Sequence, residues 1–383
     1  MDSFIKFSIQ FVMVFRILCF LYSLLGIDAK RERNCKIVNT KSVLTFEKLV
    51  IFCKNVKWLN GWCHYKIFFD LMIKYITHSQ IDKQKWDHCI KNSPVFLPYT
   101  YSWYLDIVSP GWEALIRGDY EFIMPLTGSR KFGINYVFPP TYCQQLGVIP
   151  AHEKNQFEID DFICSIPDKY SYISIFLNRN NIITNPSLVD KIHYGTNYVL
   201  NMNESYQTIS KHYSENTIRN IKKAIKREIE FTDKPISALE WSQHKIEMIY
   251  EKKIQLRKKY AYRIADLINL ENKEKQNLFY TAYNHSNNII SGLLVMIISK
   301  TAMIFSFSKK EGKESRAYFM LLDKFIKEYA GKINTLDFMG SNIPGIAYTN
   351  EGFGGVPVKY PVIEINRLPR WVNFFRRMTK KSR

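Results

Sequence analysis

The stretch that decides the fold runs from Ile289 to Phe307 and reads IISGLLVMIISKTAMIFSF. It holds two apolar runs, 289–299 and 302–307, which are rich in β-branched and aromatic residues and are separated by a short polar break. Runs of this length and composition are typical of strands. The stretch therefore predicts two adjacent strands joined by a tight connection.

The segments around this pair alternate between helical and extended patterns. After it, the sequence predicts a helix over 315–330 ended by Gly331, a strand over 335–339, a turn containing Gly340 and Pro344, and a last strand over 356–365. Before it, three apolar-periodic segments predict helices over 205–228, 239–260 and 270–285. This half of the chain is therefore expected to be mixed α/β.

The first half has the same mixed character. A strand is expected from Met72, a helix over 82–91 and a short helix near 99–106. Short β-type runs separated by turn signals then predict a largely antiparallel meander, with strands near 112–116, 120–126, 131–138, 171–177 and 197–202 and a helix over 160–165. The fold class is thus α/β with mixed sheets, and two halves of similar size, 72–203 and 204–366, suggest a duplicated unit.

Both ends of the chain differ from this pattern. Residues 4–27 are strongly apolar and are followed by basic residues, which is typical of a membrane anchor. The abrupt change in character at Met72 supports a different hypothesis, in which Met72 is the initiator and 1–71 are translated upstream sequence. At the other end, 367–383 forms a basic amphipathic tail that can lie on an anionic membrane surface or pack on the domain.

Composition limits the class of partner and of chemistry. The 383 residues carry a formal net charge of +19, which favours partners with phosphate or carboxylate groups. The seven cysteines are odd in number and contain no C-x-x-C pair, so neither a zinc site nor a disulfide framework is indicated, and a reducing, cytoplasmic location is expected. The eight histidines lack ligand-like spacing, and no P-loop, G-x-G-x-x-G, G-x-S-x-G or H-E-x-x-H motif is present, so no metal is expected.

Basic residues gather on one predicted helix. Arg219, Lys223 and Lys226 recur at helical spacing in the segment 205–228, opposite its apolar stripe. Such a row suits a pyrophosphate or a nucleic-acid backbone. A solvated helix face explains it equally well.

Two strand ends offer groups for catalysis. The segment from Ser308 to Ser315 joins a strand to a helix, where free backbone N–H groups can hold a phosphate or an oxyanion, although Ser315 can equally be only a helix cap. The run Leu336-Asp-Phe-Met-Gly-Ser places a carboxylate, Asp337, and a hydroxyl, Ser341, at the end of a buried strand. Asp337 can orient or deprotonate an amine nucleophile, or it can be a structural residue bonded to turn amides.

These motifs resemble those of a known family. The order of a helix with Ser214-Glu-Asn-Thr-Ile-Arg-Asn-Ile-Lys-Lys-Ala, two central strands, a helix, Leu336-Asp-Phe-Met-Gly-Ser and Glu351-Gly-Phe-Gly-Gly with Tyr360 is similar to the FemAB-type branch of the GNAT acyltransferase superfamily. The runs Pro98-Tyr-Thr-Tyr-Ser-Trp-Tyr-Leu-Asp and Gln144-Gln-Leu-Gly also resemble proteins of that group. The resemblance covers Met72 to about Ile365 and implies two tandem GNAT-like units around a central cleft.

The resemblance also implies an activity. Members transfer an amino acid from aminoacyl-tRNA to an amine of a peptidoglycan precursor, or an acyl group from a thioester such as acyl-CoA. It implies donor binding in the second unit but provides no family-wide catalytic base, so Asp337 and Ser341 are catalytic candidates only through their place at the end of a strand. The residues expected to contact substrate or phosphate are Arg219, Lys223, Ser306, Ser308, Gly312, Ser315, Arg316, Tyr104 and Gln144.

The sequence departs from the family at the donor loop. The usual Arg/Gln-x-x-Gly-x-Gly/Ala is replaced by Lys309-Lys-Glu-Gly-Lys-Glu-Ser-Arg-Ala, which is more compatible with a tRNA-linked donor than with tight CoA binding. The expected function is N-acyl transfer to a primary amine by a cytoplasmic protein with no bound cofactor, in peripheral contact with the membrane if its tail binds lipid. The alternative is a non-catalytic basic module that binds nucleic acid or anionic lipid.

Overall fold

The computed structural model describes residues 72–131, 133–153, 159–227, 229–251, 258–340, 342–369 and 372. The segment 1–71, with its proposed membrane anchor or upstream start, lies outside these residues, as does most of the basic tail. Of the described residues, Asn185–Asp190 belong to one unit of the chain, and those up to Thr184 and from Lys191 onward belong to another. In the described part of the first unit, the side chain of Asn185 caps a short helix, α7 (Pro186–Val189). No helix in the described ranges is long and apolar enough to cross a membrane.

The second unit begins with a four-stranded antiparallel sheet in the order β1-β2-β3-β6. Its strands are β1 (Ile73–Ile76), β2 (Glu113–Arg117), β3 (Phe122–Leu126) and β6 (Ile149–Pro150). The helical elements beside it are η1 (His78–Gln80), α4 (Lys83–Asn92), η2 (Pro98–Thr100), α5 (Ser102–Val108) and α6 (Ile159–Cys164). Trp86 of α4 and Trp112 are fully buried and meet edge to face, with ring centroids 4.6 Å apart. This aromatic pair anchors α4 in the core.

A ten-stranded sheet forms the rest of the frame, in the order β4-β5-β7-β14-β8-β13-β12-β11-β10-β9. Its strands are β4 (Gly128–Lys131), β5 (Ile134–Val137), β7 (Tyr170–Phe176), β8 (Ile192–Asn201), β9 (Glu230–Thr232), β10 (Lys275–Tyr283), β11 (Ile289–Ile298), β12 (Thr301–Ser308), β13 (Thr335–Asp337) and β14 (Val356–Asn366). Neighbouring strands run antiparallel except in the pairs β5–β7 and β12–β13. The sheet therefore contains strands from both halves of the sequence.

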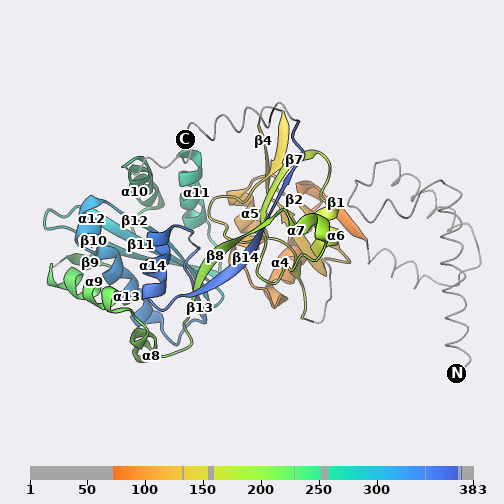
Figure 1. The fold of residues 1–383 in the computed structure, drawn as a ribbon. Coiled ribbons are helices and arrows are strands. Elements are labelled where there is room, and N and C mark those ends of the chain that lie inside the picture. Colours follow the sequence, from red (N-terminus) through yellow and green to blue (C-terminus); the bar gives the residue numbers. More distant parts are fainter. Residues whose placement is uncertain are drawn as a thin grey trace, which may run out of the picture. The chain divides into compact units, whose positions relative to one another are not determined.

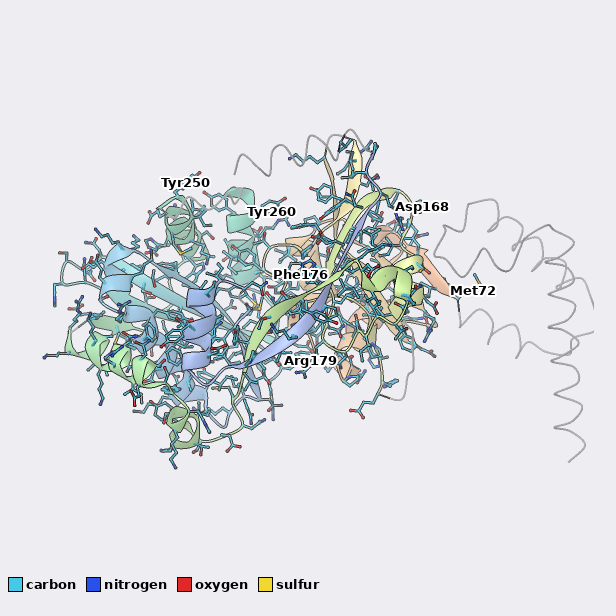
Figure 2. All side chains as sticks on the ribbon, viewed as in Figure 1. Met72, Asp168, Phe176, Arg179, Tyr250 and Tyr260 are labelled. Carbon is cyan, nitrogen blue, oxygen red and sulfur yellow. The ribbon has the colours of Figure 1, made fainter. Side chains whose placement is uncertain are left out.

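Strand β14 connects the two halves of this sheet. It pairs with β8 from Val356 to Ile363 and with β7 from Val362 to Asn366, and Figure 1 shows β8 and β14 side by side. The ring of Phe176 on β7, labelled in Figure 2, contacts that of Tyr360 on β14, with centroids 5.7 Å apart. The last strand that the structure describes thus pairs with strands of the first half of the chain.

Helices accompany the part of the sheet that runs from β8 through β13, β12, β11 and β10 to β9. They are α8 (Tyr206–Lys211), α9 (Glu215–Lys226), α10 (Ala238–Glu251), α11 (Lys258–Asn269), α12 (Lys310–Glu314), α13 (Ala317–Tyr329) and α14 (Pro344–Gly352). Helix α13 packs on β10, β11 and β12 and buries Leu321, Leu322 and Phe325. Helix α9 packs in turn on α13 and α14. Apolar burial of this face, at roughly 25 cal/mol per Å², is the main force that holds the layers together.

The predicted strands 289–299, 302–307 and 356–365 and the predicted helix 315–330 are confirmed as β11, β12, β14 and α13. The helix predicted over 205–228 is instead two helices, because Ser214 leaves the helical path and caps α9 through Thr217 N. The helix predicted over 270–285 is wrong: β10 lies there, paired with β9 and β11. The turn near Pro344 contains an additional helix, α14, with Pro344 in its first turn, where its missing N–H costs nothing.

Candidate functional site

The central feature of the site is a place where two parallel strands separate. Strand β12 pairs with β11 along its whole length, from Thr301 to Ser308, but its pairing with β13 ends at Met303 and Asp337. Beyond that point Phe338 N donates to the carbonyl of Tyr198 on β8, at 3.0 Å. The edge of β12 after Met303 therefore has no β13 partner, and an unpaired strand edge presents backbone N–H and C=O groups.

A cavity of about 280 Å³ occupies the space between the separated strands. Its lining combines β12, the turn after β13, helices α10, α13 and α14, and a segment from the first half of the chain. The lining residues are Tyr142, Cys143, Gln144, Lys245, Ile304, Phe305, Ser306, Tyr318, Phe338, Met339, Gly340, Ile346 and Asn350. Both halves of the sequence thus contribute to one cavity.

Asp337 lies at the end of β13 and supports the turn that lines the cavity. Its Oδ1 accepts from Met339 N at 2.7 Å and from Asn197 Nδ2 at 3.1 Å. Burial raises the pKa of its carboxyl to about 6, although both hydrogen bonds favour the ionised form. Met339 and Gly340 follow with φ of 60° and 74°, so the carboxylate holds a left-handed turn in place. Ser341 lies outside the described residues.

Gln144 is a predicted residue that does line the cavity. Its Nε2 donates to the hydroxyl of Tyr360 at 2.9 Å. A Cβ on Gly340 would lie 2.3 Å from the same Nε2, so a larger residue there would displace the Gln144 amide as well as strain the backbone at φ 74°. Tyr104, a second predicted residue, lies fully buried behind the cavity and donates to the carbonyl of Tyr142 at 2.8 Å.

The predicted donor loop divides into two parts. Ser306 lines the cavity, and its carbonyl accepts from Lys245 Nζ at 2.6 Å. The hydroxyl of Ser308 hydrogen-bonds that of Ser291 at 2.7 Å instead. Gly312 lies against the backbone of β11, where a Cβ would be 2.2 Å from the carbonyl oxygen of Ile290.

Ser315 and Arg316 form the junction between α12 and α13. Ser315 N donates to the carbonyl of Glu311 at 2.8 Å, and its hydroxyl donates to that of Gly312 at 3.2 Å. Arg316 has φ of 66° and is the N-cap residue of α13. The segment before α13 is therefore a short helix closed by its own hydrogen bonds rather than an open loop.

Arg219 and Lys223 lie on the exposed face of α9 and are not among the residues that line the cavity. Arg219 Nη2 donates to Asn216 Oδ1 at 2.8 Å, and Lys222 and Lys226 are exposed beside it. The buried face of the same helix carries Thr217, Asn220 and Ala224. The predicted cationic row thus exists as a solvated surface, and the structure does not bring it to the cavity.

Sequence reasoning missed several residues at the cavity, among them Tyr142, Lys245, Tyr318 and Asn350. Tyr142 packs its ring on Phe305, with centroids 5.6 Å apart. The only signals were indirect, because Tyr142 and Asn350 stand next to the quoted runs at Gln144 and Glu351. Among the residues that the structure describes, no group of three or more His, Cys, Asp or Glu is arranged to hold a metal ion.

Comparison with known proteins relates this arrangement to solved folds. No family model matches the sequence, and no curated protein matches it. The chain is similar in fold to the crystal structure of FemX, with a TM-score of 0.51 and 10% sequence identity. The superposition covers 75% of this chain and 96% of the FemX chain. L-PGS from Bacillus licheniformis is 8% identical (78% and 96% covered, TM-score 0.43). A tandem GNAT protein from the clavulanic acid biosynthesis pathway is 11% identical (78% and 99% covered, TM-score 0.45). The likeness to FemX is one of fold, and it confirms the fold class that the sequence predicts.

Proposed function

We propose that this protein is an N-acyltransferase that moves an acyl or aminoacyl group from a thioester or ester to a primary amine. The observation that carries the proposal is the separation of β12 and β13 around the cavity. Backbone N–H groups on an unpaired strand edge can hydrogen-bond a donor carbonyl and stabilise the oxyanion that forms when the amine attacks. The rest of the cavity then positions the amine.

The reaction needs little else from the protein. The neutral amine forms a C–N bond to the carbonyl carbon, the C–S or C–O bond to the leaving group breaks, and the amine gives up one proton. Positioning and carbonyl polarisation supply much of the rate in such reactions. Asp337, with a pKa raised to about 6, is proposed as the base that takes up the amine proton, although it supports the turn beside the cavity and is not itself a lining residue. Ser341 of the same run is the second catalytic candidate.

The finer assignment rests on the family resemblance and on the fold shared with FemX. It proposes a FemAB-type enzyme with acyl-CoA or aminoacyl-tRNA as donor and an amine of a cell-wall precursor as acceptor. The short helix α12, which stands where the resemblance places the CoA pyrophosphate loop, favours the tRNA-linked donor. The proposed location is the cytoplasm, at the inner face of the membrane if the tail binds lipid.

The test is a transfer assay on the purified full chain. Acetyl-CoA and aminoacyl-tRNA are each incubated with a panel of primary amines, and amide products are identified by mass spectrometry. We expect amide formation that depends on protein and time with one of the two donors. A CoA donor should also raise the free energy of unfolding by about 2.7 kcal/mol when free ligand is one hundred times Kd. Intact donors and no amide with any amine would contradict the proposal.

The exposed cations on α9 support the second candidate, a basic module that binds a polyanion without catalysis. The two candidates differ in what Arg219→Ala and Lys223→Ala change. For the enzyme, these substitutions should lower kcat/KM, because the part of the donor outside the cavity loses its contacts. For the module, they should only weaken an association that salt also weakens.

A further inference from the structure

Two residues that line the cavity each carry a buried polar group without a hydrogen-bond partner. Asn350 is 2% exposed, and its Nδ2 has no partner. The hydroxyl of Tyr142 is also buried and unpaired. An unmet buried donor costs about 1–3 kcal/mol, and such groups in folded proteins usually have a partner. The pair therefore indicates a ligand that supplies hydrogen-bond acceptors.

The one charged group among the described lining residues is a cation. It is Lys245, whose Nζ donates to the carbonyl of Ser306 at 2.6 Å. Of the lining residues described, none is Asp or Glu. The cavity is therefore rich in donors and positive in charge, which favours an anion with more than one oxygen.

The size of the cavity limits the ligand. A volume of about 280 Å³ lies just below the usual range for ligand pockets, roughly 300–1,000 Å³, so the ligand must be small. A carboxylate accepts through two oxygens with about four lone pairs and matches two neutral donors and an ammonium. A small molecule with a carboxylate and an amine therefore suits the cavity, because the strand edge of β12 is part of the same lining.

We propose that the cavity binds the acceptor as an amino acid or short peptide, and that Asn350, Tyr142 and Lys245 hold its carboxylate. This inference rests on the proposed function, since the amine of the same molecule is the nucleophile. Asn350 and Tyr142 then determine acceptor specificity.

The test measures binding by calorimetry on the full chain without any donor. The probes are the twenty standard amino acids, L-alanyl-L-alanine, the matching amides and inorganic phosphate. At least one carboxylate probe should bind ten times or more tightly than its amide. Equal binding of acid and amide, binding of phosphate alone, or no binding would overturn the inference.

Matched variants locate the bound carboxylate. Tyr142→Phe and Asn350→Leu should each weaken carboxylate binding at least tenfold while Tm is kept, because each removes a group that has no partner in the protein. Tyr99→Phe is the control: its side chain is also fully buried, but Tyr99 is not a lining residue. Equal binding by all three variants would place the ligand elsewhere and overturn the inference.

The two proposals can fail separately. If carboxylates bind as described but no amide forms with either donor, the acceptor site stands and the transferase proposal fails. If amides form with equal kcat/KM on amines that lack a carboxylate, the transferase stands and the carboxylate inference fails.

Discussion

Asp337 shows how much one residue can be understood from sequence. Its place at the end of a buried strand, before Gly340, was enough to single it out. The structure adds that its carboxylate holds Met339 N in a left-handed turn, which is the structural role that the sequence left open beside the catalytic one. Tyr142 and Asn350 could not be found in this way, because only the folded chain brings them to the same cavity.

Asp337 also predicts how stability depends on pH. A carboxyl whose pKa is raised from 3.8 to about 6 favours the folded state at low pH, and this contribution is lost as pH rises through about 6. The shift in pKa between the unfolded and the folded protein corresponds to about 3 kcal/mol in the free energy of unfolding. Asp337→Asn keeps an oxygen for both hydrogen bonds but cannot ionise.

We therefore expect the stability of Asp337→Asn relative to wild type to rise by up to about 3 kcal/mol between pH 4 and pH 7. Urea denaturation at several pH values measures it, with the exposed Asp233→Asn as control. A difference that stays constant with pH would show that the carboxyl titrates alike in the folded and unfolded protein.

At the scale of elements, the sequence predicts the secondary structure of the apolar runs correctly and that of some amphipathic segments wrongly. Strands β11 and β12 follow from composition, because β-branched and aromatic residues decide between strand and buried helix in such apolar runs. Strand β10 was predicted as a helix because its pairing with β9 and β11 is decided by distant parts of the chain. Helix α14 was missed because Pro344 and Gly345 are typical of turns, although proline is well suited to a first helical turn.

Two helical glycines test the packing of these elements. Gly312 of α12 lies so close to β11 that a Cβ would be 2.2 Å from the carbonyl oxygen of Ile290. Gly345 of α14 has nothing within 4 Å of the same position. Gly312→Ala should lower the free energy of unfolding by about 1–3 kcal/mol through overpacking. Gly345→Ala should raise it by up to about 1 kcal/mol, because alanine favours helix.

Chemical denaturation of the two variants checks this contrast. A stable Gly312→Ala protein would show that α12 does not pack on β11 as described, and the position of the connection between β12 and α13 would then be wrong.

At the scale of the whole molecule, the sequence predicted the mixed α/β class but not how its halves combine. Similar patterns before and after residue 204 suggested two units, yet one sheet takes strands from both, and β14 at the end of the chain pairs with β7. Long-range pairing of this kind leaves no local signal. It matters for function because the same arrangement brings the segment Tyr142–Gln144 to the strands of the second half.

The measurement that tests the central claim most directly is the transfer rate of a protein whose cavity has been filled. Ser306 lines the cavity on β12, whereas Thr301, on the same strand, lies within the paired part of β12 and β13. If acyl transfer takes place between the separated strands, Ser306→Leu should lower kcat/KM by roughly a hundredfold with little change in Tm, because the reacting groups are displaced. Thr301→Leu should keep the rate of the wild type. A Ser306→Leu protein that is folded and as active as wild type would contradict the account.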